Sequence, residues 1–304
     1  MFQQIRHTAR FNRLHRQSFV TKLKRRLKHP VSALVSFSKQ APMTDISPMI
    51  QIDIHDHVAV VTLDRPEKRN AVNDALRNQL MAALDKVNAD DAVRAIVLTG
   101  TGSVFCAGGD ISGMRARLDA PRGEVGYNGW RRQKQTHRLI STIYHMDKPI
   151  VAAVNGAASG LGCDLALACD FIVAGATATF SMTYLRRGLI PDGGGLYFLP
   201  RRVGTVRAKE LIFSTRNVGA EEAVSIGLAD RLGGDDPRND AVAWANELAV
   251  GPPAAIALAK SIVNRAVDLP LETVFALGSE AQSICYASDE HHDAVNAFLN
   301  KSSK

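Results

Sequence analysis

Three absences in this 304-residue sequence narrow its class. Four cysteines are present but form no Cys-x-x-Cys pair, so neither a zinc motif nor a disulfide framework is indicated. No stretch approaches the ~20 consecutive apolar residues that a membrane-spanning helix needs. No internal repeat or low-complexity segment is evident. The hydrophobic content of 46% is enough for a sizeable core, and we expect a globular protein of a reducing compartment.

Acidic residues are missing from the first 42 positions, which contain ten Lys and Arg residues. This basic arm (residues 1–42) has a charge of +10, whereas the whole chain has a net charge of +7. The rest of the chain is therefore mildly acidic, at −3. The acidic remainder argues against a nucleic-acid-binding body. Three interpretations of the arm stay open: a mitochondrial transit peptide, a segment that touches anionic lipid or RNA, or an extension ahead of a start at Met43. We expect the third, which implies a cytoplasmic protein whose catalysis does not need the arm.

The most informative stretch runs from Lys148 to Gly195. Residues 150–154 form an apolar run typical of a buried strand, and the next two residues, Asn and Gly, indicate a turn. Residues 160–162 are Gly-Leu-Gly and precede an apolar helix that opens at Cys163. Residues 170–174 and 180–185 are predicted to be extended.

Glycines before a helix suit a particular chemistry. They let a ligand approach the backbone, and the first N–H groups of the helix are free to donate. Donors from residues 160–162 could hold negative charge that develops on a carbonyl oxygen. Asp164 and Asp192 lie nearby in sequence, and two carboxylates in one pocket favour proton transfer. The alternative, equally open on the residues alone, is that Asp164 only stabilises the helix N-terminus and Asp192 only caps a turn.

Elsewhere the periodicity predicts alternating strands and helices. Residues 50–64 fit a β-hairpin or two short strands, and Asn73 is a candidate N-cap for a helix with apolar residues at near-helical spacing. Residues 93–99 fit a buried strand, 114–128 a loop or broken helix, and 130–146 a helix. Helical patterns run from residue 240 to the end. His137 and His145 have no motif partner in the sequence, and we interpret both as surface or packing residues.

Two segments resemble a known family. Residues 105–111 (FCAGGDI) and 148–170 (KPIVAAVNGAASGLGCDLALACD) are similar to motifs of the crotonase, or enoyl-CoA hydratase/isomerase, superfamily. The resemblance covers residues 50–300 and implies an α/β fold, a crotonase-type spiral of ββα units. It also implies a core over residues 49–236 and a C-terminal helical region over 237–304 that builds a homotrimer or hexamer.

The resemblance also implies a site for an acyl-CoA thioester. Backbone N–H groups of Ala107 and Leu161 would hold the thioester oxygen, and Asp192 and Asp164 would exchange protons with the substrate. The substrate-binding residues that it implies are Lys68, Arg69, Ala107, Gly108, Gly109, Asp110, Ile111, Gly160 and Tyr184. No metal or redox cofactor is expected, because CoA belongs to the substrate.

One departure from the family decides the expected reaction. Hydratases of the family use two glutamates, which align here with Asp164 and Tyr184, so the second carboxylate is missing. Asp192 falls where isomerase branches carry an acid. The resemblance therefore implies an enoyl-CoA isomerase, with an enoyl-CoA hydratase that uses two aspartates as the alternative. A member that only binds acyl-CoA, or that binds RNA through the basic arm, is a third hypothesis.

Overall fold

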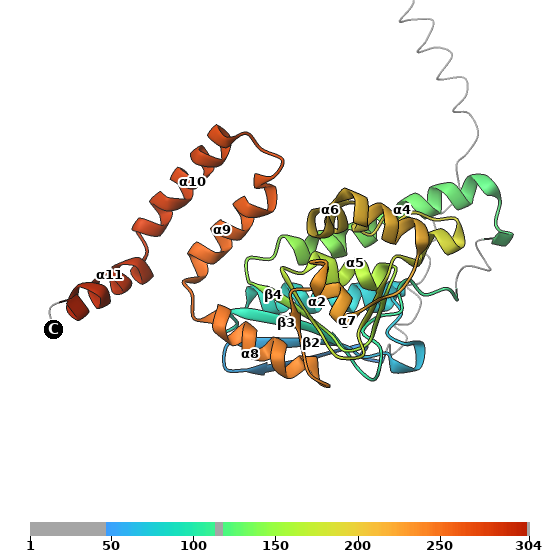
Figure 1. Ribbon diagram of the computed structural model, residues 1–304, viewed down its shortest axis with the longest axis horizontal. Coiled ribbons are helices and arrows are strands. Elements are labelled where there is room, and N and C mark those ends of the chain that lie inside the picture. The colour runs from blue at the N-terminus through green and yellow to red at the C-terminus, as the bar shows by residue number, and fades with distance from the viewer. Residues whose placement is uncertain (1–46, 113–117, 303–304) are drawn as a thin grey trace, which may run out of the picture. The chain divides into compact units, whose positions relative to one another are not determined.

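A six-stranded sheet forms the centre of the fold (Figure 1). The computed structural model describes residues 47–112 and 118–302, so the expectations about the basic arm lie outside the described residues. The predicted hairpin is confirmed as antiparallel strands β1 and β2, and the remaining strands of the sheet are parallel to their neighbours. The strand order is β1 (Ile50–His55), β2 (Val58–Leu63), β3 (Ala95–Gly100), β4 (Ile150–Val154), β6 (Phe171–Ala174) and β9 (Arg231–Leu232).

Both faces of this sheet are covered, which explains why its central strands are apolar without alternation. On one face Val60, Val97 and Val151 pack against α8 (Pro237–Ala249), whose Trp244 is mostly buried. On the other face the strands pack against a larger helical layer (Figure 1). That layer contains α2 (Asp74–Ala89), α4 (Arg122–Tyr144), α5 (Leu161–Ala168), α6 (Gly195–Ser214) and α7 (Ala220–Ser225). The mixed α/β class is thus confirmed.

A second, smaller sheet supports the segment around Asp164. Strands β5 (Ala157–Ser159) and β7 (Thr179–Ser181) are parallel, and β8 (Val218–Gly219) is antiparallel to β7. The prediction that residues 180–185 are extended is therefore wrong beyond Ser181. The chain forms the 3-10 helix η2 (Thr183–Arg187) instead, and this turn brings Tyr184 against Asp164.

Two helix starts test the local patterns. The N-cap prediction is confirmed, because the Asn73 side chain accepts a hydrogen bond of 2.8 Å from the backbone N–H of Leu76. Helix α4 begins at Arg122, eight residues before the predicted start at 130. Three glycines lower the intrinsic helix propensity of its first turns. Side chains contact one another along these turns: Tyr127 stacks on Trp130, and Lys134 Nζ lies 3.8 Å from the centre of the Trp130 ring.

The last helices are α9 (Pro253–Ala266), α10 (Leu271–Tyr286) and α11 (Asp289–Ser302), and η1 (Pro66–Lys68) completes the inventory of described elements. Helix α8 packs on the sheet, so the core extends past the boundary predicted at residue 237. Helix α9 contacts the core through an ion pair of 2.6 Å between Lys260 and Asp170. Among the described residues, no single helix is long and apolar enough to cross a membrane. Helices α8 and α9 reach that length and apolar content only if they are counted together, and they are bent by 107° at the break between them.

Candidate active site

A cavity of about 890 Å³ lies where the motif segments meet. The start of α2, the 107–112 loop, the start of α5, the η2 turn and one side of α4 all contribute to its wall. The described residues that line it are Val72, Asn73, Asp74, Ala75, Arg77, Ala107, Gly108, Gly109, Asp110, Ile111, Ser112, Asn128, Arg131, Arg132, Gln133, Gln135, Thr136, Ser159, Gly160, Leu161, Thr183, Tyr184, Arg187, Leu189, Ile190 and Asp192.

Backbone pairing fixes the two glycine-containing loops next to each other. The N–H of Cys106 donates to the Ala157 carbonyl at 3.0 Å, and the N–H of Ser159 donates back to the Cys106 carbonyl at 3.0 Å. A Cβ atom added to Gly108 would lie 2.6 Å from the Ser159 carbonyl oxygen and 3.6 Å from the Leu161 nitrogen. Only a glycine fits at this close approach, where φ is also +98°. The first motif therefore lies directly beside the start of α5.

The donor predicted at Ala107 needs correction. Its N–H donates to the Arg69 carbonyl at 3.0 Å, so it is already used within the protein. The N–H of Gly109 makes no hydrogen bond to any described residue, although its neighbours do: Val72 N–H donates to the Gly108 carbonyl at 2.8 Å, and Asp110 N–H to the Val72 carbonyl at 2.9 Å. The Gly109 amide, two residues after the predicted position, is thus a donor of this loop that no described residue uses.

The second predicted donor remains available. Leu161 is the first residue of α5, and its N–H has no partner among the described residues. Gly160, with φ 52° and ψ −119°, precedes it in a conformation that disfavours other residues. Two free amides, those of Gly109 and Leu161, therefore border the same cavity.

Asp164 is placed behind the cavity wall. It is fully buried on the first turn of α5, and its Oδ2 accepts a short hydrogen bond from the Tyr184 hydroxyl. Oδ1 has no hydrogen-bond partner of regular geometry among the described residues, although the Gly195 amide nearby favours the ionised carboxyl. Burial raises the pKa of Asp164 to about 7, and the nearby Asp192 adds to this increase, while the Tyr184 hydrogen bond opposes it.

Asp192 borders the cavity itself. Burial raises the pKa of its carboxyl above the ordinary value, while a hydrogen bond from its own backbone N–H and the electrostatic effect of nearby His137 and Arg132 oppose that increase. The His137 Nε2 lies 3.0 Å from the Asp192 backbone oxygen, so this histidine helps to hold the loop. The interpretation of His137 as a surface or packing residue missed this contact. Nothing in the local sequence indicates it, because 55 positions separate the two residues.

The other predicted residues divide into two groups. Gly108, Gly109, Asp110, Ile111, Gly160 and Tyr184 all line the cavity, as expected. Lys68 and Arg69 are exposed and do not belong to its described lining, and Arg69 reaches the site only through its carbonyl bond to Ala107. Their role at the CoA phosphates stays a prediction.

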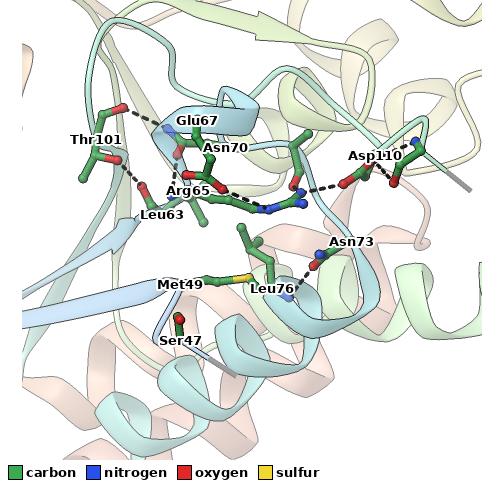
Figure 2. Close-up of polar contacts among 12 residues, drawn as sticks. Ser47, Met49, Leu63, Arg65, Glu67, Asn70, Asn73, Leu76, Thr101 and Asp110 are labelled. Atoms are coloured by element: carbon green, nitrogen blue, oxygen red, sulfur yellow. Dashed lines mark hydrogen bonds and ion pairs between the residues drawn. The ribbon is translucent and has the colours of Figure 1, made fainter. Parts of the chain in front are cut away.

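Asp110 has a supporting role that the sequence did not indicate (Figure 2). Its carboxylate forms a 2.6 Å ion pair with Arg65 and also accepts hydrogen bonds from the N–H and hydroxyl of Ser112. These hydrogen bonds and the Arg65 charge hold its pKa down at about 2. Arg65 also donates to the Ala71 carbonyl at 3.0 Å, and Asn70 accepts from the Arg65 N–H at 2.9 Å. The pair thus fixes the loop that presents the Gly109 amide.

Among the described residues, no group of three or more His, Cys, Asp or Glu side chains could hold a metal ion. The expectation that the reaction needs neither a metal nor a redox cofactor stays a prediction.

The raised pKa of Asp164 predicts a pH-dependent stability. Between its ordinary value of 3.8 and about 7, the folded protein holds a proton that the unfolded chain has lost. The free energy of unfolding should therefore fall as pH rises through this window, by up to about 1.4 kcal/mol per pH unit from this group. Asp164→Asn should remove this slope in urea unfolding measured at several pH values. A constant difference between wild type and variant from pH 4.5 to 6.5 would contradict the assignment.

Comparisons with known proteins identify the family of this chain. A family model described as enoyl-CoA hydratase/isomerase matches residues 53–304. A protein of Rhodobacter capsulatus named "Probable enoyl-CoA hydratase" is 39% identical over 254 residues, which cover 83% of this chain and 95% of that protein. The 1,2-epoxyphenylacetyl-CoA isomerase of Escherichia coli K12 is 34% identical over 247 residues, covering 81% of this chain and 93% of that protein.

A solved structure shares the fold as well as the sequence pattern. The crystal structure of an enoyl-CoA hydratase/isomerase from Cupriavidus metallidurans CH34 superposes with a TM-score of 0.77 at 36% identity, and the match covers 83% of this chain and 94% of that one. The expected crotonase-type fold is therefore confirmed, and an acyl-CoA thioester is the substrate class consistent with the family. The chain belongs to the enoyl-CoA hydratase/isomerase family.

Proposed function

We propose that this enzyme shifts a carbon–carbon double bond within an enoyl-CoA thioester, with Asp192 as the group that moves the proton. The observation that supports this best is the unequal placement of the two aspartates. Asp192 lines the cavity, whereas Asp164 is fully buried and does not belong to the described lining. A single accessible carboxylate suits a reaction in which one group removes a proton and returns it at another carbon.

The other acids of the described cavity wall are already engaged. Asp110 pairs with Arg65 at 2.6 Å, and Asp74 pairs with Arg77 at 2.7 Å. Asp192 forms no ion pair within 4 Å of a described residue, so its carboxylate is free to meet substrate. Its raised pKa brings it closer to neutral pH, where a proton acceptor and donor works best.

The reaction that follows is a balanced proton shift. The thioester oxygen accepts hydrogen bonds from the amides of Gly109 and Leu161. Asp192 removes a proton from the carbon between the carbonyl and the double bond of a 3-enoyl-CoA, and the electrons move toward the thioester oxygen. The same proton returns to the far carbon of the former double bond, giving the 2-enoyl-CoA. Loss of one such oxygen-binding donor costs ~3 kcal/mol in other enzymes, so two donors supply a large part of the catalysis.

A second candidate is hydration of a 2-enoyl-CoA. The name of the Rhodobacter capsulatus relative favours it. Hydration needs a water molecule held between two acids, which here would be Asp164 and Asp192. Tyr184 occupies the direct approach, since its hydroxyl donates to Asp164 and its side chain lines the cavity. That arrangement makes hydration the less favoured of the two reactions.

Product mass separates the candidates. Full-length enzyme is incubated with a 3-enoyl-CoA and, separately, with a 2-enoyl-CoA, and the thioesters are analysed by mass spectrometry. Isomerisation leaves the mass unchanged while the ultraviolet absorbance of the conjugated thioester appears, and hydration adds one water. We expect rapid isomerisation and slow hydration. Faster hydration than isomerisation would contradict the proposal, and tight CoA binding without any conversion would favour a non-catalytic member.

The expected assembly into trimers or hexamers also belongs to this proposal. Helices α9 and α10 bury none of their residues within the chain. Several of their large apolar side chains are more than half exposed, including Val263 at 68%, Leu271 at 60% and Phe275 at 64%. Apolar surface of this extent favours a partner surface. Light scattering on the purified protein should give a mass close to three or six times 32.9 kDa, and a monomer would contradict the expectation.

A further inference from the structure

One wall of the cavity carries polar and charged side chains at helical spacing. Asn128, Arg131, Arg132 and Gln135 of α4 all line the cavity. Their separations of three, four and seven residues place them on one face of the helix. Thr136 and Gln133 line it as well. A pocket for a plain hydrocarbon chain would be lined mainly by apolar side chains. This polar α4 wall (Asn128, Arg131, Arg132 and Gln135) therefore indicates a different acyl group.

Three arginines at the cavity form no close ion pair among the described residues, although Arg132 lies near enough to Asp192 to affect its pKa. Arg131, Arg132 and Arg187 line the cavity, and none of them forms an ion pair within 4 Å of a carboxylate among the described residues. The nearest aromatic contact is that of Arg131 with the Tyr127 ring, at 5.9 Å. Guanidinium groups match a carboxylate with two parallel hydrogen bonds, and they do so best in a partly enclosed site. The cavity therefore has unused capacity for an anion.

The position of these arginines matters because CoA is itself anionic, and its phosphates could also bind arginine side chains. Arg132 is close enough to Asp192 to oppose the rise in its pKa, and Arg187 follows Tyr184 by three residues in the η2 turn. Asp192 must lie beside the reacting carbons of the acyl group if the proposed function holds. The phosphates of CoA are separated from those carbons by the whole pantetheine arm. Arg132, which lies near Asp192, therefore belongs to the acyl end of the cavity rather than to the nucleotide end, and Arg187 lines the same cavity.

We infer that the acyl group carries a carboxylate at the end remote from the thioester, and that Arg132, with Arg131 and Arg187, binds it. The substrate class is then the mono-CoA thioester of an unsaturated dicarboxylic acid. This inference rests on the proposed function, because Asp192 locates the reacting carbons. Apolar side chains that also line the cavity, among them Val72, Leu161 and Ile190, remain available for the carbons between the two ends.

Binding of unreactive ligands tests the inference without relying on the reaction. Isothermal titration of the full-length protein compares three ligands: CoA, hexanoyl-CoA and the mono-CoA thioester of the saturated six-carbon dicarboxylic acid. Wild type should bind the carboxylated thioester at least about tenfold more tightly than hexanoyl-CoA. Arg132→Gln should reduce this preference by about tenfold, and Arg132→Lys should retain part of it, because charge remains but the paired geometry is lost. Neither variant should alter the affinity for CoA or hexanoyl-CoA by more than about twofold.

A matched control comes from the same helix. Arg138 is exposed on α4 and does not belong to the described cavity lining, so Arg138→Gln should keep the full preference. Equal binding of the two thioesters by wild type would overturn the inference. So would an equal loss of affinity for CoA itself in Arg132→Gln, since that places the arginine at the phosphates. If wild type prefers the carboxylated thioester but does not isomerise a 3-enoyl-CoA, only the proposed reaction is overturned. If it binds no thioester, the acyl-CoA site as a whole is overturned.

Discussion

Replacement of Asp192 by asparagine should lower kcat for isomerisation of a 3-enoyl-CoA by about a hundredfold or more. The amide keeps the size of the carboxylate but can neither accept nor return the proton, and acid/base groups of this kind contribute about 10²- to 10⁴-fold. KM should change little, because in the proposed reaction the amides of Gly109 and Leu161, not Asp192, hold the thioester. Initial rates by ultraviolet absorbance, with circular dichroism to confirm folding, give the measurement.

A surface aspartate serves as the matched control for that variant. Asp85 is exposed on α2 and is absent from the described cavity lining, so Asp85→Asn should retain wild-type rates. If Asp192→Asn isomerised as fast as this control, Asp192 would not be the proton-transfer group. Asp164 would then be the remaining candidate, even though it lies behind Tyr184.

Loss of the Lys260 charge should cost about 3–5 kcal/mol of unfolding free energy at neutral pH. Lys260 Nζ lies 2.6 Å from Asp170 Oδ2 and donates to the Lys148 carbonyl at 3.0 Å. Both side chains are largely buried, with exposed fractions of 9% and 16%. Lys260→Met keeps most of the side-chain volume but leaves the Asp170 carboxylate without its charge partner. Urea unfolding at pH 7, followed by circular dichroism, measures the effect.

The pH dependence of that variant has a definite sign. Burial already raises the pKa of Asp170, while Lys260 opposes this. Without the lysine the pKa of the carboxyl rises further, so the folded variant holds a proton at pH values where the unfolded chain has lost it. The free energy of unfolding that Lys260→Met loses relative to wild type should therefore become smaller as the pH is lowered toward 5.

Lys209→Met, at an exposed position of α6, is the control and should change the free energy of unfolding by less than about 0.5 kcal/mol. An equal, small change in both variants would mean that the buried pair does not stabilise α9 on the core.

Much of the fold was readable from local pattern. The hairpin at 50–64, the Asn73 cap and the buried strand at 150–154 follow from alternation, capping chemistry and unbroken apolar runs, and all three are present. The two motif segments also predicted which loops meet. Motifs of this kind are informative because each encodes a backbone shape, and Gly108 shows why: its close approach to Ser159 leaves no room for a side chain.

The parts that were mispredicted depend on contacts between distant segments. Whether the amide of Ala107 or of Gly109 is free depends on Arg69, whose carbonyl takes the first of them. The η2 turn replaces a predicted strand, and Tyr184 there contacts Asp164 twenty positions away. The early start of α4 at Arg122 overrides the low helix propensity of its glycines. No window of sequence contains these partners together, so spacing alone cannot order them.

A crystal structure with a bound unreactive enoyl-CoA analogue shows whether two amides and one carboxylate converge on the thioester. We expect the Gly109 and Leu161 nitrogens both to lie about 2.7–3.1 Å from the thioester oxygen. We also expect an Asp192 carboxylate oxygen to contact the carbon next to the thioester. A thioester oxygen bound elsewhere, or an Asp192 carboxylate directed away from the acyl carbons, would contradict the proposed site.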